Sequence, residues 1–110
     1  MTRIQYEDRM GYQLLRISGH AGDRIVCAGI SAISQTLIAN LEREEKENQI
    51  RLEWEMTEPG EMTVRAWTND RNRDEIRAMF RFTMEGLEHI RKDYPGNIEM
   101  IGEGETHGGI

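Results

Sequence analysis

The chain has 110 residues, enough for one domain with a single modest core. Its composition, 37% hydrophobic and 31% charged residues, is typical of a globular protein with a solvated surface. A net charge of −6 without a basic cluster argues against direct binding of nucleic acid through phosphates. The single Cys excludes an intrachain disulfide, and no N-terminal apolar run has the character of a signal peptide or a membrane span. We therefore expect a cytoplasmic protein with no nucleic-acid or membrane partner.

Two short runs at the N-terminus predict a β-hairpin. Residues 2–7 alternate polar and apolar side chains, and residues 12–18 follow after a turn-like segment that ends near Gly11. In the second run Leu15 and Ile17 would lie on one face and Leu14 on the other. The alternation therefore leaves open which face of this strand is buried.

Two longer segments have helical periodicity. Residues 24–46 carry an apolar stripe, with a more polar stripe of Cys27, Ser31 and Ser34 beside it. Residues 71–93 carry a second stripe and end where Pro95 stops a helix. The apolar stripe of the first segment consists of Val26, Ile30, Ile33, Leu37 and Leu41, with Ile38 beside it, and that of the second of Ile76, Met79 or Phe80, Thr83, Leu87 and Ile90.

Between and after these helices the pattern returns to a period of two. Residues 50–56 and 62–67 predict a second hairpin with one apolar face, and residues 98–101 predict a last short strand. The fold expected is α+β, with a largely antiparallel sheet backing two helices in the order ββαββαβ. The domain is predicted to cover residues 1–102, and residues 103–110 to form a disordered glycine-rich tail.

The connection into the first helix carries the residues best suited to chemistry. Gly19 and Gly22 permit a tight turn, and Asp23 is a good helix N-cap. Cys27 would then lie one turn into the helix, where its thiol points back toward His20 and the helix dipole favours thiolate over thiol. The alternative is that Cys27 is a small core residue, because free Cys is often buried.

This stretch resembles the hallmark of the ribosomal-processing cysteine protease family, Prp. The family has Gly-His-Ala, a glycine-rich loop and then a segment such as Asp-Ile-Val-Cys-Ala-Ala-Val-Ser-Ala-Leu that opens a helix. The segment at residues 86–100 is also similar to the C-terminal pattern of the family. The residues that match the hallmark are Gly19, His20, Ala21, Asp23, Ile25, Val26, Cys27, Ala28, Ile30, Ser31, Ala32 and Ile33.

The resemblance implies a cytoplasmic cysteine endopeptidase that trims the N-terminal extension of a large-subunit ribosomal protein and acts as a homodimer. His20 and Cys27 would be the catalytic pair, with no cofactor and no metal. Ser31 lies on the same helix face as Cys27 and could support the site, or could simply bond its own backbone. The N–H groups of Cys27 and Ala28 are candidates for an oxyanion site provided that the helix does not use them.

One departure from the family is the length of the connection. Only six residues, AGDRIV, separate His20 from Cys27, whereas family members generally place several more there in a mobile loop. We therefore expect slow or selective cleavage. Two other functions remain open: a protease for a phage capsid or scaffold protein, and a catalytically silent homodimeric binding module. The sequence does not indicate the cleavage motif, the host or the dimer interface.

Overall fold

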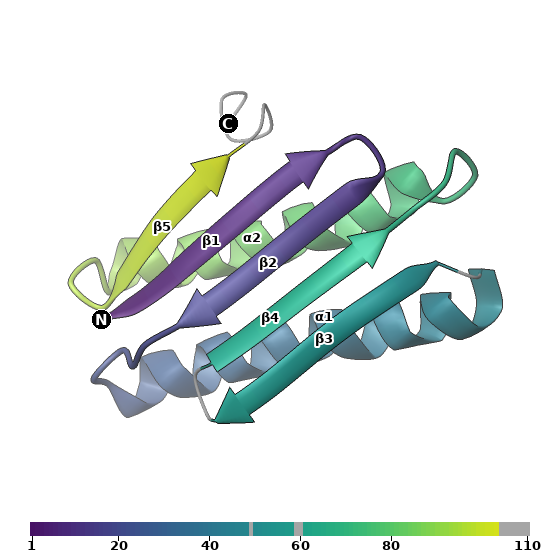
Figure 1. Cartoon of the computed structure of the whole chain (residues 1–110). Helices are drawn as coiled ribbons and strands as arrows, with labels where there is room; N and C mark the ends of the chain where they lie inside the picture. The colour runs from purple at the N-terminus through teal and green to yellow at the C-terminus, as the bar shows by residue number, and fades with distance from the viewer. Residues whose placement is uncertain (49, 59–60, 104–110) are drawn as a thin grey trace.

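Along the chain, two antiparallel hairpins are each followed by a long helix, and a final strand ends the fold (Figure 1). The structure is a computed structural model, and it describes residues 1–48, 50–58 and 61–103. The predicted order ββαββαβ is confirmed. Its elements are β1 (Thr2–Arg9), β2 (Tyr12–Ser18), α1 (Arg24–Asn48), β3 (Arg51–Glu58), β4 (Glu61–Trp67), α2 (Arg73–Asp93) and β5 (Ile98–Glu103).

The five strands form one sheet with the order β3-β4-β2-β1-β5. Neighbouring strands are antiparallel except for β1 and β5, which are parallel. Parallel pairing requires a long crossover, and α2 supplies it by returning the chain to the edge beside β1. Both helices lie on the same side of the sheet (Figure 1). The predicted largely antiparallel sheet backing two helices is therefore confirmed.

The core lies between the sheet and the helices. The sequence did not indicate which face of β2 is buried. The structure shows that it is the face of Leu15 and Ile17, whereas Leu14 is half-buried on the other face. Trp54 and Met56 on β3 keep 43% and 41% of their surface exposed, since β3 is an edge strand. The buried apolar residues of the sheet are Ile4, Tyr6, Leu15, Ile17, Met62, Val64, Ala66 and Ile98.

Helix α1 buries a slightly different stripe from the predicted one. Ser34, expected on the more polar stripe, is buried, and its hydroxyl donates to the carbonyl of Ile30 at 2.5 Å. Ile33 is half-buried and packs toward α2, where a Cβ added at Gly86 would lie 3.1 Å from its Cδ1 atom. In length and composition α1 could also span a membrane, but the core helix of a globular protein meets the same criteria. Six residues of α1 are buried here.

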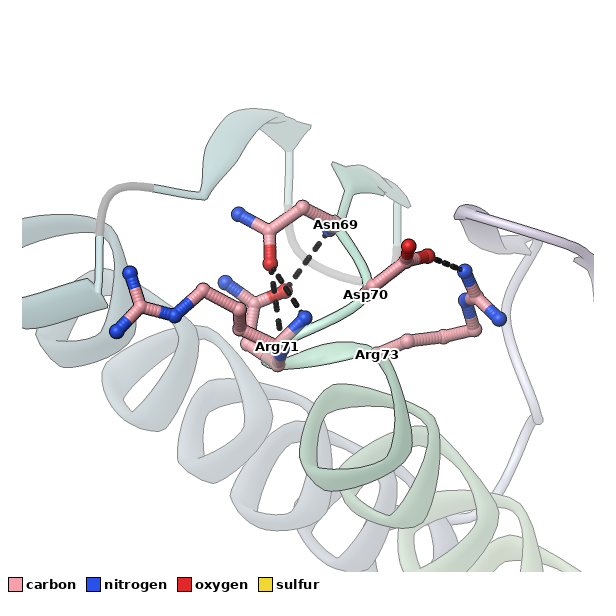
Figure 2. Close-up of polar contacts among 5 residues, drawn as sticks. Asn69, Asp70, Arg71 and Arg73 are labelled. Atoms are coloured by element: carbon pink, nitrogen blue, oxygen red, sulfur yellow. Dashed lines mark hydrogen bonds and ion pairs between the residues drawn. The ribbon is translucent and has the colours of Figure 1, made fainter.

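The connection from β4 to α2 is held by two asparagines (Figure 2). The N–H of Asn69 donates to Oδ1 of Asn72 at 3.0 Å, and Oδ1 of Asn69 accepts from the N–H groups of Arg71 and Asn72 at 2.9 and 3.3 Å. The side chain of Asn72 also donates to the carbonyl of Asn48 at 3.3 Å, which ties this turn to the end of α1. Helix α2 therefore begins at Arg73, two residues later than expected.

A series of hydrogen-bonded polar side chains joins the turn end of the β1–β2 hairpin to α2. The hydroxyl of Tyr6 donates to Gln13 at 2.5 Å, and the amide of Gln13 donates to Asp8. Asp8, only 3% exposed, also pairs with Arg77 at 2.9 Å. These partners compensate the desolvation of the Asp8 carboxylate.

The C-terminal boundary differs slightly from the expectation. Strand β5 continues to Glu103 instead of ending at residue 101. The predicted disordered tail otherwise falls on residues 104–110, which lie outside the described residues.

Candidate active site

His20 and Cys27 flank the short connection from β2 to α1. His20 is exposed in the loop directly after β2, and Cys27 lies in the first turns of α1. Cys27 is half-buried and packs against the core. The connection from β2 to α1 lies at the end of the sheet where the chain also has its N-terminus (Figure 1).

Two glycines shape this connection through positive φ angles, 85° at Gly19 and 79° at Gly22. L-residues with a side chain rarely adopt this region. A Cβ at Gly19 would lie 2.5 Å from the carbonyl oxygen of Met1, whereas one at Gly22 would have no described atom within 4 Å. Gly19 therefore lets the loop pass close against the first residues of β1.

Asp23 caps helix α1, as the sequence predicted. Its Oδ1 atom accepts hydrogen bonds from the N–H groups of Ile25 at 2.8 Å and Val26 at 3.1 Å. Its carbonyl accepts from the N–H of Cys27 at 3.0 Å, so the helix begins directly after it. Because the helix uses the Cys27 N–H, this group does not meet the requirement that an oxyanion-site N–H be free of the helix. Ala28 lies one residue further inside the same helix.

Cys27 lies on the side of α1 that faces away from α2. Gly29 marks the side facing α2, because a Cβ there would lie 3.0 Å from Cδ1 of Ile90. Two residues correspond to about 200° around a helix, so Cys27 and Ser31 both lie nearly opposite Gly29. Ser31 is exposed on this side of α1.

A groove between the two helices lies on the other side of α1. Its lining includes Ile33 and Leu37 from α1 and Met79 and Phe82 from α2. Neither His20 nor Cys27 is among its lining residues. This apolar groove is therefore separate from the candidate active site.

Two residues missed by the sequence analysis hold the loop on either side of His20. Oε1 of Glu61, at the start of β4, accepts from the N–H of Gly19 at 3.3 Å. Nδ2 of Asn97, just before β5, donates to the carbonyl of Ala21 at 2.5 Å. These partners lie 42 and 76 residues away along the chain, so no local motif could have indicated them.

The connection carries the imidazole of His20 and the thiol of Cys27, the two groups that nucleophilic catalysis by a thiol requires. In the part of the chain described, no three His, Cys, Asp or Glu side chains gather to hold an ion. The connection supplies both chemical groups from one short segment.

The fold is shared with solved bacterial proteins. An essential ribosomal processing protease Prp from Staphylococcus aureus, in complex with a covalently linked product peptide, has a TM-score of 0.71 and 24% identity, with 94% of this chain and 100% of that chain covered. The complex of such a protease with a substrate peptide gives 0.69 and 20% over the same shares. A Streptococcus mutans protein gives 0.66 and 18%, with 94% and 96% covered.

At these identities the solved structures establish the fold, and the sequence itself establishes the family. No curated protein matches the chain. Residues 1–99 match the family described as cysteine protease Prp, a range that includes both hairpins, both helices and the connection carrying His20 and Cys27. The chain therefore belongs to the Prp family of cysteine proteases.

Proposed function

We propose that this chain is an endopeptidase in which His20 and Cys27 form the catalytic pair, and that it removes the N-terminal extension of a large-subunit ribosomal protein. The observation that carries the proposal is the connection itself. It places an exposed imidazole and a thiol on either side of a capped helix start. The related S. aureus protein is a ribosomal processing protease that was solved with peptides.

The proposed reaction has two steps. His20 takes the proton of Cys27, the sulfur attacks the scissile carbonyl, and the C–N bond breaks as His20 returns the proton to the leaving amine. Water, deprotonated by His20, then attacks the thioester, and the thiol of Cys27 is released with the acid product. Every proton transfer uses the same imidazole, so no metal or cofactor enters the scheme.

Gly19, Asp23, Ala28 and Ser31 would support the pair without reacting. Gly19 and Asp23 shape the turn and begin the helix. Ser31 lies one turn beyond Cys27 on the same side of α1, where its exposed hydroxyl could contact a bound peptide. Ala28 is exposed beside Cys27 and leaves room for substrate. A cytoplasmic location would keep Cys27 reduced.

The test is incubation with a panel of purified precursors, including ribosomal proteins with N-terminal extensions and phage capsid and scaffold proteins, followed by mass spectrometry of the products. We expect one cut in a ribosomal precursor, and its loss in both Cys27→Ala and His20→Ala. His89→Ala is the matched control, because His89 is exposed on α2 outside the proposed site. Cleavage that persists in Cys27→Ala would refute the proposed mechanism.

The six-residue connection favours a second candidate, a silent binding module. Its expected result differs in the same experiment. Such a module would bind a precursor and cut none of the panel, with binding unchanged in Cys27→Ala. Cleavage confined to phage proteins would instead support the phage protease.

A further inference from the structure

Asn97 contacts the active-site connection from a distant part of the sequence. It lies between α2 and β5, and its Nδ2 atom donates to the carbonyl of Ala21 at 2.5 Å. Ala21 follows His20 immediately and is only 3% exposed. A buried carbonyl needs a hydrogen-bond partner, and here a side chain from the opposite end of the sequence provides it.

The main chain of Asn97 is held independently of this contact. Its carbonyl accepts from the N–H of Thr2 at 2.9 Å, and its N–H donates to the carbonyl of Tyr94 at 3.0 Å. Asn97 is thus anchored both to the start of β1 and to the turn after α2. Because the anchor is the backbone, the side-chain amide has a defined position from which to hold Ala21.

The other side of His20 is held as well. The N–H of Gly19 donates to Glu61, and Gly19 lies so close to Met1 that no side chain would fit. His20 is therefore an exposed residue between two anchored neighbours. Anchoring both neighbours restricts the backbone from which the imidazole projects.

We propose that Asn97 is a positioning residue for His20, acting through the carbonyl of Ala21. This inference rests on the proposed function, since it assumes that the His20 imidazole does the proton transfer. Asn97 contacts main chain and not the reacting atoms, so it is not a catalytic residue. A general base acts only within hydrogen-bond reach of its proton, and misplacement of about 1 Å can cost about 100-fold in rate.

The direct test compares Asn97→Ala and Asn97→Asp with the wild-type chain on a cleaved precursor. Aspartate has nearly the same shape as asparagine but cannot donate when ionised, so both variants lose the bond to Ala21. We expect kcat to fall about 10- to 100-fold in both, with KM changed less than about threefold.

Asn72→Ala is the matched control. Asn72 is buried and Asn97 is half-buried. The side chain of Asn72 also donates to a main-chain carbonyl, that of Asn48, but Asn72 follows the end of β4 opposite Glu61. We expect it to lower the denaturation midpoint while kcat stays at the wild-type value. An equal fall of kcat in Asn72→Ala and Asn97→Ala would show that Asn97 acts only through stability, and would overturn the inference.

Two further readouts separate positioning from general damage. In a His20→Ala background, adding Asn97→Ala should leave cleavage at the level of His20→Ala alone, because the two residues act as one unit. The NMR signals of the His20 ring should shift or broaden in Asn97→Ala and stay unchanged in Asn72→Ala. Unchanged His20 signals together with wild-type kcat would refute the inference.

The NMR readout also keeps the two proposals distinguishable. If the wild-type chain cleaves nothing but the His20 signals change in Asn97→Ala, the proposed function fails and the structural link between Asn97 and His20 stands. If the wild-type chain cleaves and Asn97→Ala matches it in kcat, the proposed function stands and the positioning role fails.

Discussion

At the scale of single residues, Gly19 and Gly22 test how the turn depends on its backbone. Both have positive φ, but only Gly19 has a backbone atom where a Cβ would be placed. We expect Gly22→Ala to cost about 1 to 2 kcal/mol from left-handed strain alone, and Gly19→Ala clearly more, because β1 would have to move. Urea denaturation of the two variants provides the measurement. Equal losses would contradict the close approach to Met1.

Asp8 and Arg77 form the second residue-scale test. Asp8 is buried, so Arg77→Met would remove the charged partner of its carboxylate and leave it the hydrogen bond from Gln13. We expect Arg77→Met to lower the free energy of unfolding by about 1 to 3 kcal/mol. Arg81→Met, an exposed site one turn later on α2, should change it by less than about 0.5 kcal/mol. A loss as small as that of Arg81→Met would show that the buried pair contributes little.

At the scale of elements, the start of α1 depends on Asp23. Its side chain accepts from two N–H groups of the first turn that have no acceptor within the helix. We expect Asp23→Ala to cost about 0.5 to 2 kcal/mol, and Asp23→Asn to retain most of the stability because asparagine caps almost as well. Thermal or urea unfolding is the measurement, and an Asp23→Ala variant as stable as Asp23→Asn would count against the cap.

The connection between β2 and α1 has six residues between His20 and Cys27, fewer than the resemblance to the family leads us to expect. Six residues can span the gap from His20 to Cys27, since an extended chain reaches about 3.3 to 3.6 Å per residue. A connection this short, held at Gly19 and Ala21, cannot close over a peptide as a long lid would. We therefore expect slow cleavage that becomes faster when a longer glycine-rich loop is grafted between Ala21 and Asp23. A graft that lowers kcat without affecting folding would contradict this.

At the scale of the whole molecule, both helices cover one face of the sheet and leave the other without a helical layer (Figure 1). Apolar side chains are also exposed on the helices, among them Phe82 at 71% and Ile25 at 69%. A chain of this size with exposed apolar surface often gains stability by self-association. We predict a homodimer, which sedimentation velocity at micromolar concentration would detect. A single monomeric species across that range would rule it out.

The family and the element order were available from the sequence because both depend on local information. The alternation in the strands, the helical stripes and the Gly19 to Cys27 segment all lie within short windows, and the cap by Asp23 needs only the first helical turn. The roles of His20 and Cys27 came from the resemblance and stay predictions. Helix α2 was expected two residues too early because Asn69 and Asn72 bond each other in the turn before it.

The surroundings of the site were decided only by the tertiary structure. Strand alternation cannot say which face the helices will cover, so the burial of Leu15 and Ile17 required the packed layer. Helical periodicity placed Ser34 beside Cys27, but its burial depends on the angle at which α1 meets the sheet. The contacts of Glu61 and Asn97 with the loop arise because β4 and β5 begin beside it in space, and hydrogen bonds between residues so far apart leave no pattern in the sequence.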